Sequence, residues 1–294
     1  MIGHSIPAEK LRLAEEIASR LCRVSGVVAV ALGGSPARGT RHAQSDLDIG
    51  LYYREAAPFA IDEIRLLARD LDAAGAPTVA GLGEWGPWMN GGAWIQASVC
   101  KVDLLFRSLD LLERTARDAK AGLCSHDYHQ QPPFGLGSLT CLAEIECCAP
   151  LHDEAGELQR LKAAIATYPP ALAERVTADS LWAAEFSLLF AADFARRGDI
   201  PSTVGCLTRC FHSLVQALFA LNRRYFTGDK GALAAIEGFA KRPDGFAEVV
   251  NRVLAGPGDN SAKLTASVEQ LKGLFRATAA LAVGYRPRFS VPGA

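Results

Sequence analysis

The chain has 294 residues, the length of about two average domains, and 49% of them are hydrophobic and 21% charged. This composition excludes a mainly disordered protein, because it supplies enough apolar surface for a core in each half. The formal net charge is −1, and no long run of one sign occurs. Both features argue against a nucleic-acid coat or a polybasic membrane anchor, so we expect neither a membrane nor a nucleic acid as partner.

The N-terminal sequence lacks the basic and then apolar order of a signal peptide, and no segment approaches about 18 uninterrupted apolar residues. We therefore expect a cytoplasmic protein. The eight cysteines include no C-x-x-C pair, so free thiols are a better interpretation than a disulfide scaffold. Cys124, His126 and His129 could ligate zinc, but their spacing matches no strong zinc pattern, and we interpret their segment as an interdomain loop.

The first part of the chain alternates helix and strand patterns. The segment VVAVAL, residues 27–32, is continuous, β-branched and apolar, which is typical of a strand covered on both faces. A long connection, residues 75–92, is rich in glycine and tryptophan, and we expect a functional loop there. Taken in chain order, the patterns predict a helix over 8–23, strands over 27–32 and 46–53, a helix over 61–73, strands over 93–98 and 101–106, and a helix over 109–120.

After Gly122 the strand signals stop and amphipathic helix patterns take over. Helices are predicted over 134–148, 154–166, 172–197, 203–226 and 258–283. The expected fold class is therefore α+β. A domain over residues 1–125, with a mixed sheet and flanking helices, precedes an all-helical bundle domain over residues 126–294.

Two acids mark the second predicted strand. Asp46 and Asp48 lie two positions apart, so their side chains project from one face about 7 Å apart. Such a pair is costly to bury without a counter-charge, which Mg²⁺ would supply. The alternative is a strand end that opens to solvent. Asp103 is a third acid, on a strand whose neighbours are apolar. Three carboxylates can hold two divalent ions and leave one oxygen to take a proton.

The turn before these acids has the composition of a phosphate site. Gly33 and Gly34 allow close approach of a bulky anion, and Ser35 adds a hydroxyl at a predicted helix start. A phosphate site followed by a metal site is what a nucleoside triphosphate requires. Glu144 and Glu146 lie on the first predicted helix of the second half. One of them is a further candidate base, and a solvated helix face is the alternative.

The segment GGSPARGTRHAQSDLDIGLYY, residues 33–53, resembles the signature of the DNA polymerase beta-type nucleotidyltransferase superfamily: Gly-Gly-Ser, a spacer, Asp-x-Asp, and a later third acid. The likeness covers residues 27–107 and is greatest to aminoglycoside nucleotidyltransferases and related small bacterial proteins. It implies that Gly33, Gly34 and Ser35 bind the triphosphate tail and that Asp46 and Asp48 hold metal ions. It also implies that Asp103 is a metal ligand, the general base, or both.

Basic residues complete the expected nucleotide site. Pro36 departs from the residue expected after Gly-Gly-Ser, which makes Arg38 the nearest charge. The segment LNRRYFTGDK resembles the triphosphate contacts in the helical domain of streptomycin-type adenylyltransferases. This likeness implies that Arg223 and Lys230 contact the nucleotide, and a solvated helix end is the alternative.

The expected function is Mg²⁺-dependent transfer of a nucleotidyl group, AMP from ATP, to a hydroxyl acceptor, with release of pyrophosphate. The acceptor is a small molecule or a protein, and the sequence does not identify it. The alternative is a catalytically silent module that senses nucleotides or acts like an antitoxin in an interaction. Trp85, Trp88 and Trp94 could stack on a base or a substrate ring, or could close the edge of the sheet.

Overall fold

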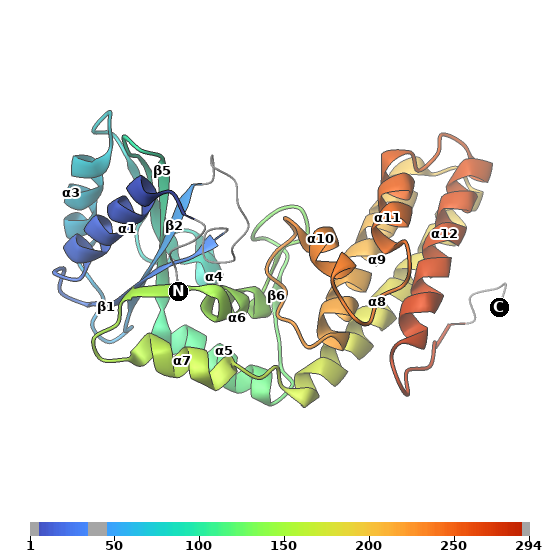
Figure 1. The fold of residues 1–294 in the computed structure, drawn as a ribbon. Coiled ribbons are helices and arrows are strands. Elements are labelled where there is room, and N and C mark those ends of the chain that lie inside the picture. Colours follow the sequence, from blue (N-terminus) through green and yellow to red (C-terminus); the bar gives the residue numbers. More distant parts are fainter. Residues whose placement is uncertain (1–5, 35–45, 290–294) are drawn as a thin grey trace. The chain divides into compact units, whose positions relative to one another are not determined.

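The computed structural model describes residues 6–34 and 46–289 (Figure 1). Two compact units divide the chain: Met1–Asp118 with Ser125–Thr167, and Ala119–Cys124 with Tyr168–Ala294. The first unit extends to Thr167, past residue 125, where the sequence analysis ends the first domain. It does so because β8 (Ala149–His152) pairs with β1 (Val27–Leu32) in its sheet.

The first unit is built on a six-stranded sheet in the order β3-β4-β5-β2-β1-β8. The remaining strands are β2 (Leu47–Tyr53), β3 (Thr78–Val79), β4 (Gly91–Gln96) and β5 (Lys101–Ser108). β2 and β5 run parallel, and the other neighbours run antiparallel. The mixed sheet predicted from the sequence is therefore confirmed.

Two helices, α1 (Ala8–Leu21) and α3 (Ile61–Leu71), pack their apolar sides on one face of this sheet (Figure 1). The contacting strand residues alternate along β2 and β5 and are fully buried, for example Leu47, Ile49 and Leu104. The opposite face therefore carries the intervening residues, among them Asp48 and Asp103. Further helices of the first unit are α4 (Gly86–Met89), α5 (Leu109–Lys120), α6 (Ser138–Cys147) and α7 (Glu157–Ile165).

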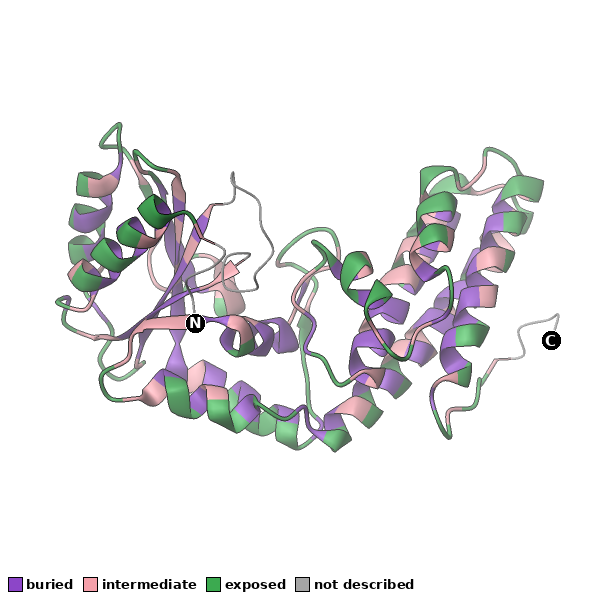
Figure 2. Cartoon of the chain, viewed as in Figure 1, coloured by how far each residue is buried: buried purple, intermediate pink, exposed green. Residues whose placement is uncertain are grey.

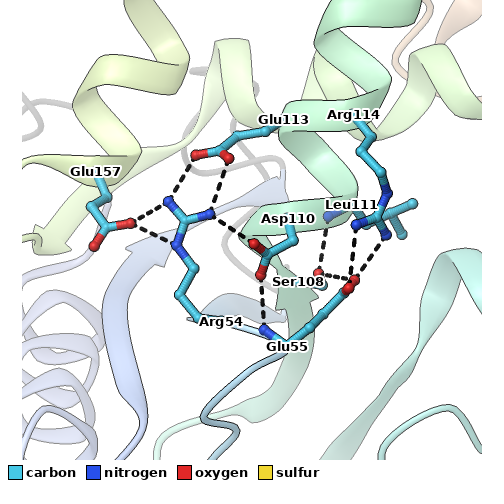
Figure 3. A network of polar contacts seen from close by, with 8 residues as sticks. All are labelled: Arg54, Glu55, Ser108, Asp110, Leu111, Glu113, Arg114 and Glu157. Atoms are coloured by element: carbon cyan, nitrogen blue, oxygen red, sulfur yellow. Dashed lines mark hydrogen bonds and ion pairs between the residues drawn. The ribbon is translucent and has the colours of Figure 1, made fainter.

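A polar network ties the carboxyl ends of β2 and β5 to α5 and α7 (Figure 3). Arg54, directly after β2, donates hydrogen bonds to Asp110 at 3.2 Å, to Glu113 at 2.8 Å and to Glu157 at 2.8 Å. One guanidinium thus bridges three carboxylates from two helices and offsets part of their mutual repulsion. This network lies at the strand ends opposite to Asp48, so it supports the sheet and leaves the acidic end free.

Arg54→Met should lower the free energy of unfolding by about 1 to 2 kcal/mol at pH 7, because it leaves Asp110, Glu113 and Glu157 near one another without a cation. Hydrogen bonds from Arg54 hold the pKa of Glu113 below its usual range. That stabilisation is present above the unfolded-state pKa and disappears as the pH falls through the folded-state pKa. The difference between variant and wild type should therefore shrink below about pH 4.

Thermal unfolding at several pH values checks this expectation. Arg65→Met is the matched control, because the Arg65 side chain is 53% exposed and pairs only with the neighbouring Asp62 in the described structure. We expect the control to change stability by less than about 0.5 kcal/mol. Equal losses in both variants would show that Arg54 acts merely as a surface residue.

The second unit is helical, as predicted. Its helices are α8 (Pro170–Arg196), α9 (Ile200–Leu221), α10 (Ala232–Glu237), α11 (Phe246–Ala255) and α12 (Ser261–Ala280). The buried residues lie where α8, α9 and α12 face one another, as Figure 2 shows. Among the described helices, α9 alone is long and apolar enough to cross a membrane, and half of its apolar stretch is buried in this unit.

Several elements differ from the sequence prediction. The connection over 75–92 contains β3 and the single turn α4, and the segment before α6 forms a small two-stranded sheet of β6 (His126–Asp127) and β7 (Leu136–Gly137). β8 was not predicted, because its sequence APLH is short and contains Pro150. α10 and α11 were missed because glycines break the pattern around them.

Candidate active site

Asp48 and Asp103 lie directly opposite each other in the parallel ladder of β2 and β5. Residues paired in this way are about 5 Å apart and point to the same face of the sheet. Asp46 precedes β2 and reaches the same group of side chains, because Lys101 contacts both Asp46 and Asp103. The three acids predicted from the sequence thus gather at the amino ends of two neighbouring strands.

The Gly33-Gly34 turn lies against Asp48. The Gly33 N–H donates a 2.8 Å hydrogen bond to the Asp48 carbonyl oxygen. Gly34 has a φ of +65°, and a Cβ there would lie 1.7 Å from Asp48 Oδ2. The backbone conformation favours glycine at this position, and any side chain there would displace the Asp48 carboxylate. Ser35 and Arg38, the other predicted residues of this turn, lie outside the described residues.

Lys101 is a site residue that the sequence analysis did not single out. Its Nζ lies 2.9 Å from Asp103 Oδ1 and 3.4 Å from Asp46 Oδ2. The hydrogen bond to Asp103 raises the pKa of Lys101. The signal in the sequence was the period-two spacing of Lys101 and Asp103, which places both on one face of β5. An ammonium group therefore bridges two of the three carboxylates.

The carboxylate oxygens of the three acids are suitable ligands for a hard divalent cation. In this structure, however, they are not arranged around a common metal position. Among the described side chains, no three His, Cys, Asp or Glu residues are placed to hold a metal ion, and Lys101 bridges Asp46 and Asp103 instead. Asp103 Oδ1 is buried and accepts no hydrogen bond from the described residues; Lys101 Nζ lies 2.9 Å from it as an ion-pair partner and donates its hydrogen bond to Oδ2. A buried carboxylate oxygen of this kind can bind a cation once Lys101 moves away.

An ion pair between the buried Arg107 and the partly exposed Glu144 lies on the same sheet face, farther along β5. Arg107 is 4% exposed and donates two hydrogen bonds, of 3.0 and 2.9 Å, to Glu144 Oε2 on α6. The Arg107 Nη1 also donates to the Met89 carbonyl oxygen. Glu144, the further candidate base of the sequence analysis, is thus already held by a buried cation.

The two basic residues that the sequence analysis predicts in the helical part have different surroundings in the structure. Arg223 follows α9 with a φ of +52° and lines a cavity of about 820 Å³ together with Lys241, Arg286 and Arg288. Lys230, exposed in the turn before α10, is not part of that lining. The cavity lies within the second unit. His126, expected in an interdomain loop, lies on β6 of the first unit, and its Nε2 contacts the Phe134 carbonyl oxygen at 2.7 Å.

Two family models match separate parts of the chain. Residues 14–80 match the nucleotidyltransferase domain family, and residues 138–230 match DUF4037, a domain of unknown function. No curated protein matches the sequence significantly. Among solved structures, a nucleotidyltransferase-like protein from Exiguobacterium sibiricum 255-15 is similar with a TM-score of 0.47 and 9% sequence identity, over 92% of this chain and 76% of that protein.

Proposed function

We propose that this chain, whose N-terminal part is a nucleotidyltransferase domain of the DNA polymerase beta type, transfers AMP from ATP to a hydroxyl acceptor and requires Mg²⁺. The general activity, nucleotidyl transfer, follows from the family of the domain. The choice of ATP, metal and acceptor is our proposal. It is supported chiefly by one observation: Asp48 and Asp103 stand side by side on parallel strands, with the Gly33-Gly34 turn against Asp48.

The site residues have two roles in this proposal. The glycine turn lets the phosphate chain approach the backbone, where N–H groups can bind its oxygens. Asp46, Asp48 and Asp103 would hold Mg²⁺, which when bound neutralises charge that develops on the phosphate oxygens. Lys101 must leave Asp46 and Asp103 for this to happen, and its positive charge then remains near the triphosphate.

Asp103 takes the proton of the acceptor hydroxyl in this proposal. The acceptor oxygen forms a bond to the α-phosphorus, and the bond from that phosphorus to the bridging oxygen breaks. The electron pair of the broken bond leaves with pyrophosphate. Positioning of the two reactants and electrostatic stabilisation supply most of the rate enhancement.

ATP binding should depend on Mg²⁺, because three carboxylates repel a polyanion until a cation intervenes. Calorimetric titration with ATP should give measurable binding with Mg²⁺ and at least about tenfold weaker binding in EDTA. A pyrophosphate-release assay with a panel of hydroxyl acceptors tests turnover. Equal affinity with and without the metal would contradict the metal assignment, and tight binding without pyrophosphate release would favour a silent nucleotide-sensing module.

A further inference from the structure

A stacked pair of tryptophans lies beside Asp48 and Asp103, toward the edge of the sheet. Trp94 on β4 lies directly opposite Asp103 on β5, which itself lies opposite Asp48 on β2. Side chains at paired positions of neighbouring strands project from the same face. The order across this face is therefore the glycine turn, Asp48, Asp103 and Trp94.

The pair combines an exposed ring, Trp94, with a partly buried one, Trp85. Trp94 is 48% exposed, and the ring of Trp85 stacks on it with centroids 5.2 Å apart and an interplanar angle of 30°. Gly92, two positions before Trp94, makes room for this ring, since a Cβ there would lie 2.6 Å from Trp85. A side chain at position 92 would push the stacked ring away from the sheet.

Hydrogen bonds hold Trp85 in this position. The backbone N–H of Trp85 donates to the Asn90 carbonyl oxygen at 2.8 Å, and the backbone carbonyl oxygen of Trp85 accepts from Gln130 Nε2 at 2.9 Å. The Asn90 side chain accepts a 2.6 Å hydrogen bond from the Gly83 N–H and so closes the loop. The ring surface thus exists without a ligand, which lowers the entropy cost of binding one.

In an in-line displacement, the leaving group and the acceptor must lie toward opposite ends of this line of residues. The leaving and attacking oxygens lie on opposite sides of the phosphorus. The glycine turn, where pyrophosphate leaves, is at one end of the row. Asp103, which takes the proton of the attacking hydroxyl, is toward the other end. The next side chain beyond Asp103 is Trp94, so the body of the acceptor must lie against it.

We infer that Trp94 and Trp85 form the acceptor platform of this site and that the acceptor hydroxyl is carried on a ring. A ring packs on an exposed indole better than an open chain does: an aromatic ring through its flat face, and a sugar ring through the C–H groups on one side of the ring. This inference rests on the proposed nucleotidyl transfer. It adds the substrate class: a ring-borne hydroxyl, either phenolic or on a sugar.

Saturation-transfer NMR with three probes tests the platform without any turnover. N-acetyltyrosinamide represents a phenolic ring, methyl α-D-glucopyranoside a sugar ring, and sorbitol an open chain with similar hydroxyl groups. We expect at least one ring probe to bind the wild-type protein and sorbitol not to bind. The variant Trp94→Leu keeps apolar bulk without a flat ring, and it should weaken ring binding about three- to tenfold. Trp85→Leu should act in the same direction.

Trp182→Leu is the matched control, because Trp182 lies on α8 in the other unit and stacks on Phe186 there. It should leave ring binding unchanged. The inference is overturned if no ring probe binds the wild type, if Trp94→Leu binds the probe equally well, or if adenosine displaces it, since the platform would then belong to the nucleotide. If no ring probe binds the wild type while Mg²⁺-dependent ATP binding is intact, the platform alone is refuted. If a ring probe binds the wild type but ATP does not bind with Mg²⁺, the proposed function alone is refuted.

Discussion

Replacing Asp48 with asparagine should lower the rate of nucleotidyl transfer by about 10³-fold or more, while the protein stays folded. Charge stabilisation by a bound cation contributes several kcal/mol to such a reaction, and each 1.4 kcal/mol changes the rate tenfold. Asparagine keeps the shape of the side chain against the Gly34 turn and removes its charge. Pyrophosphate release and the melting temperature of the same preparation check both parts of the expectation.

The melting temperature of Asp48→Asn should be unchanged or slightly higher in metal-free buffer, because the substitution removes one of three like charges. Asp70→Asn is the matched control. Its carboxylate is 68% exposed and pairs with Arg20 at the surface, so turnover should be normal. A melting temperature of Asp48→Asn lowered by many degrees would mark Asp48 as a structural residue.

The strands that carry the acids could be predicted because their patterns are local. VVAVAL and DLDIGLYY are continuous enough to identify β1 and β2, and the spacing of Asp46 and Asp48 indicates a shared face. The pairing register could not be predicted. It depends on which strand of the sheet lies beside β2, and β5 lies more than 45 residues farther along the chain. The opposition of Asp48 and Asp103 therefore came only from the structure.

The contacts that set the charge and the neighbours of the site residues also join parts of the chain that are far apart in the sequence. Lys101 bridges Asp46 and Asp103 because two strands meet in one register. The exposed ring of Trp94 is beside Asp103 for the same reason, and the sequence alone left it open whether this tryptophan binds a ring or closes the sheet edge. Similarly, nothing near Arg54 in the sequence indicates that Glu113 and Glu157 meet there. Local patterns thus predict elements, whereas charge compensation and neighbouring side chains follow from tertiary pairing.

Asp103→Asn should separate binding from chemistry. If Asp103 takes the proton of the acceptor, the variant should bind ATP with Mg²⁺ within about tenfold of the wild type, a change of 1.4 kcal/mol or less. The chemical step should fall by roughly 10² to 10⁴-fold, which is the usual contribution of a general base. Calorimetry and single-turnover kinetics on the same variant give both values.

Glu144→Gln is the control that makes this experiment specific. It changes a second carboxylate of the first unit to an amide, but Glu144 is held by the buried Arg107. We expect it to lower the melting temperature, because Arg107 loses a charged partner, and to leave the chemical step of the folded protein within about tenfold. A loss of the chemical step in Glu144→Gln similar to that in Asp103→Asn would show that Asp103 is not the specific base.

The pattern of losses then assigns the role of Asp103. Its Oδ1 is buried and lies 2.9 Å from Lys101 Nζ, while Oδ2 accepts the hydrogen bond from Lys101 at 3.0 Å. A metal ligand would lose binding and turnover together, because the cation holds the triphosphate. A base would lose only the chemical step, because the neighbouring Asp46 and Asp48 still hold the cation. Unchanged binding and unchanged turnover in Asp103→Asn would exclude both roles and leave Asp103 as the ion-pair partner of Lys101.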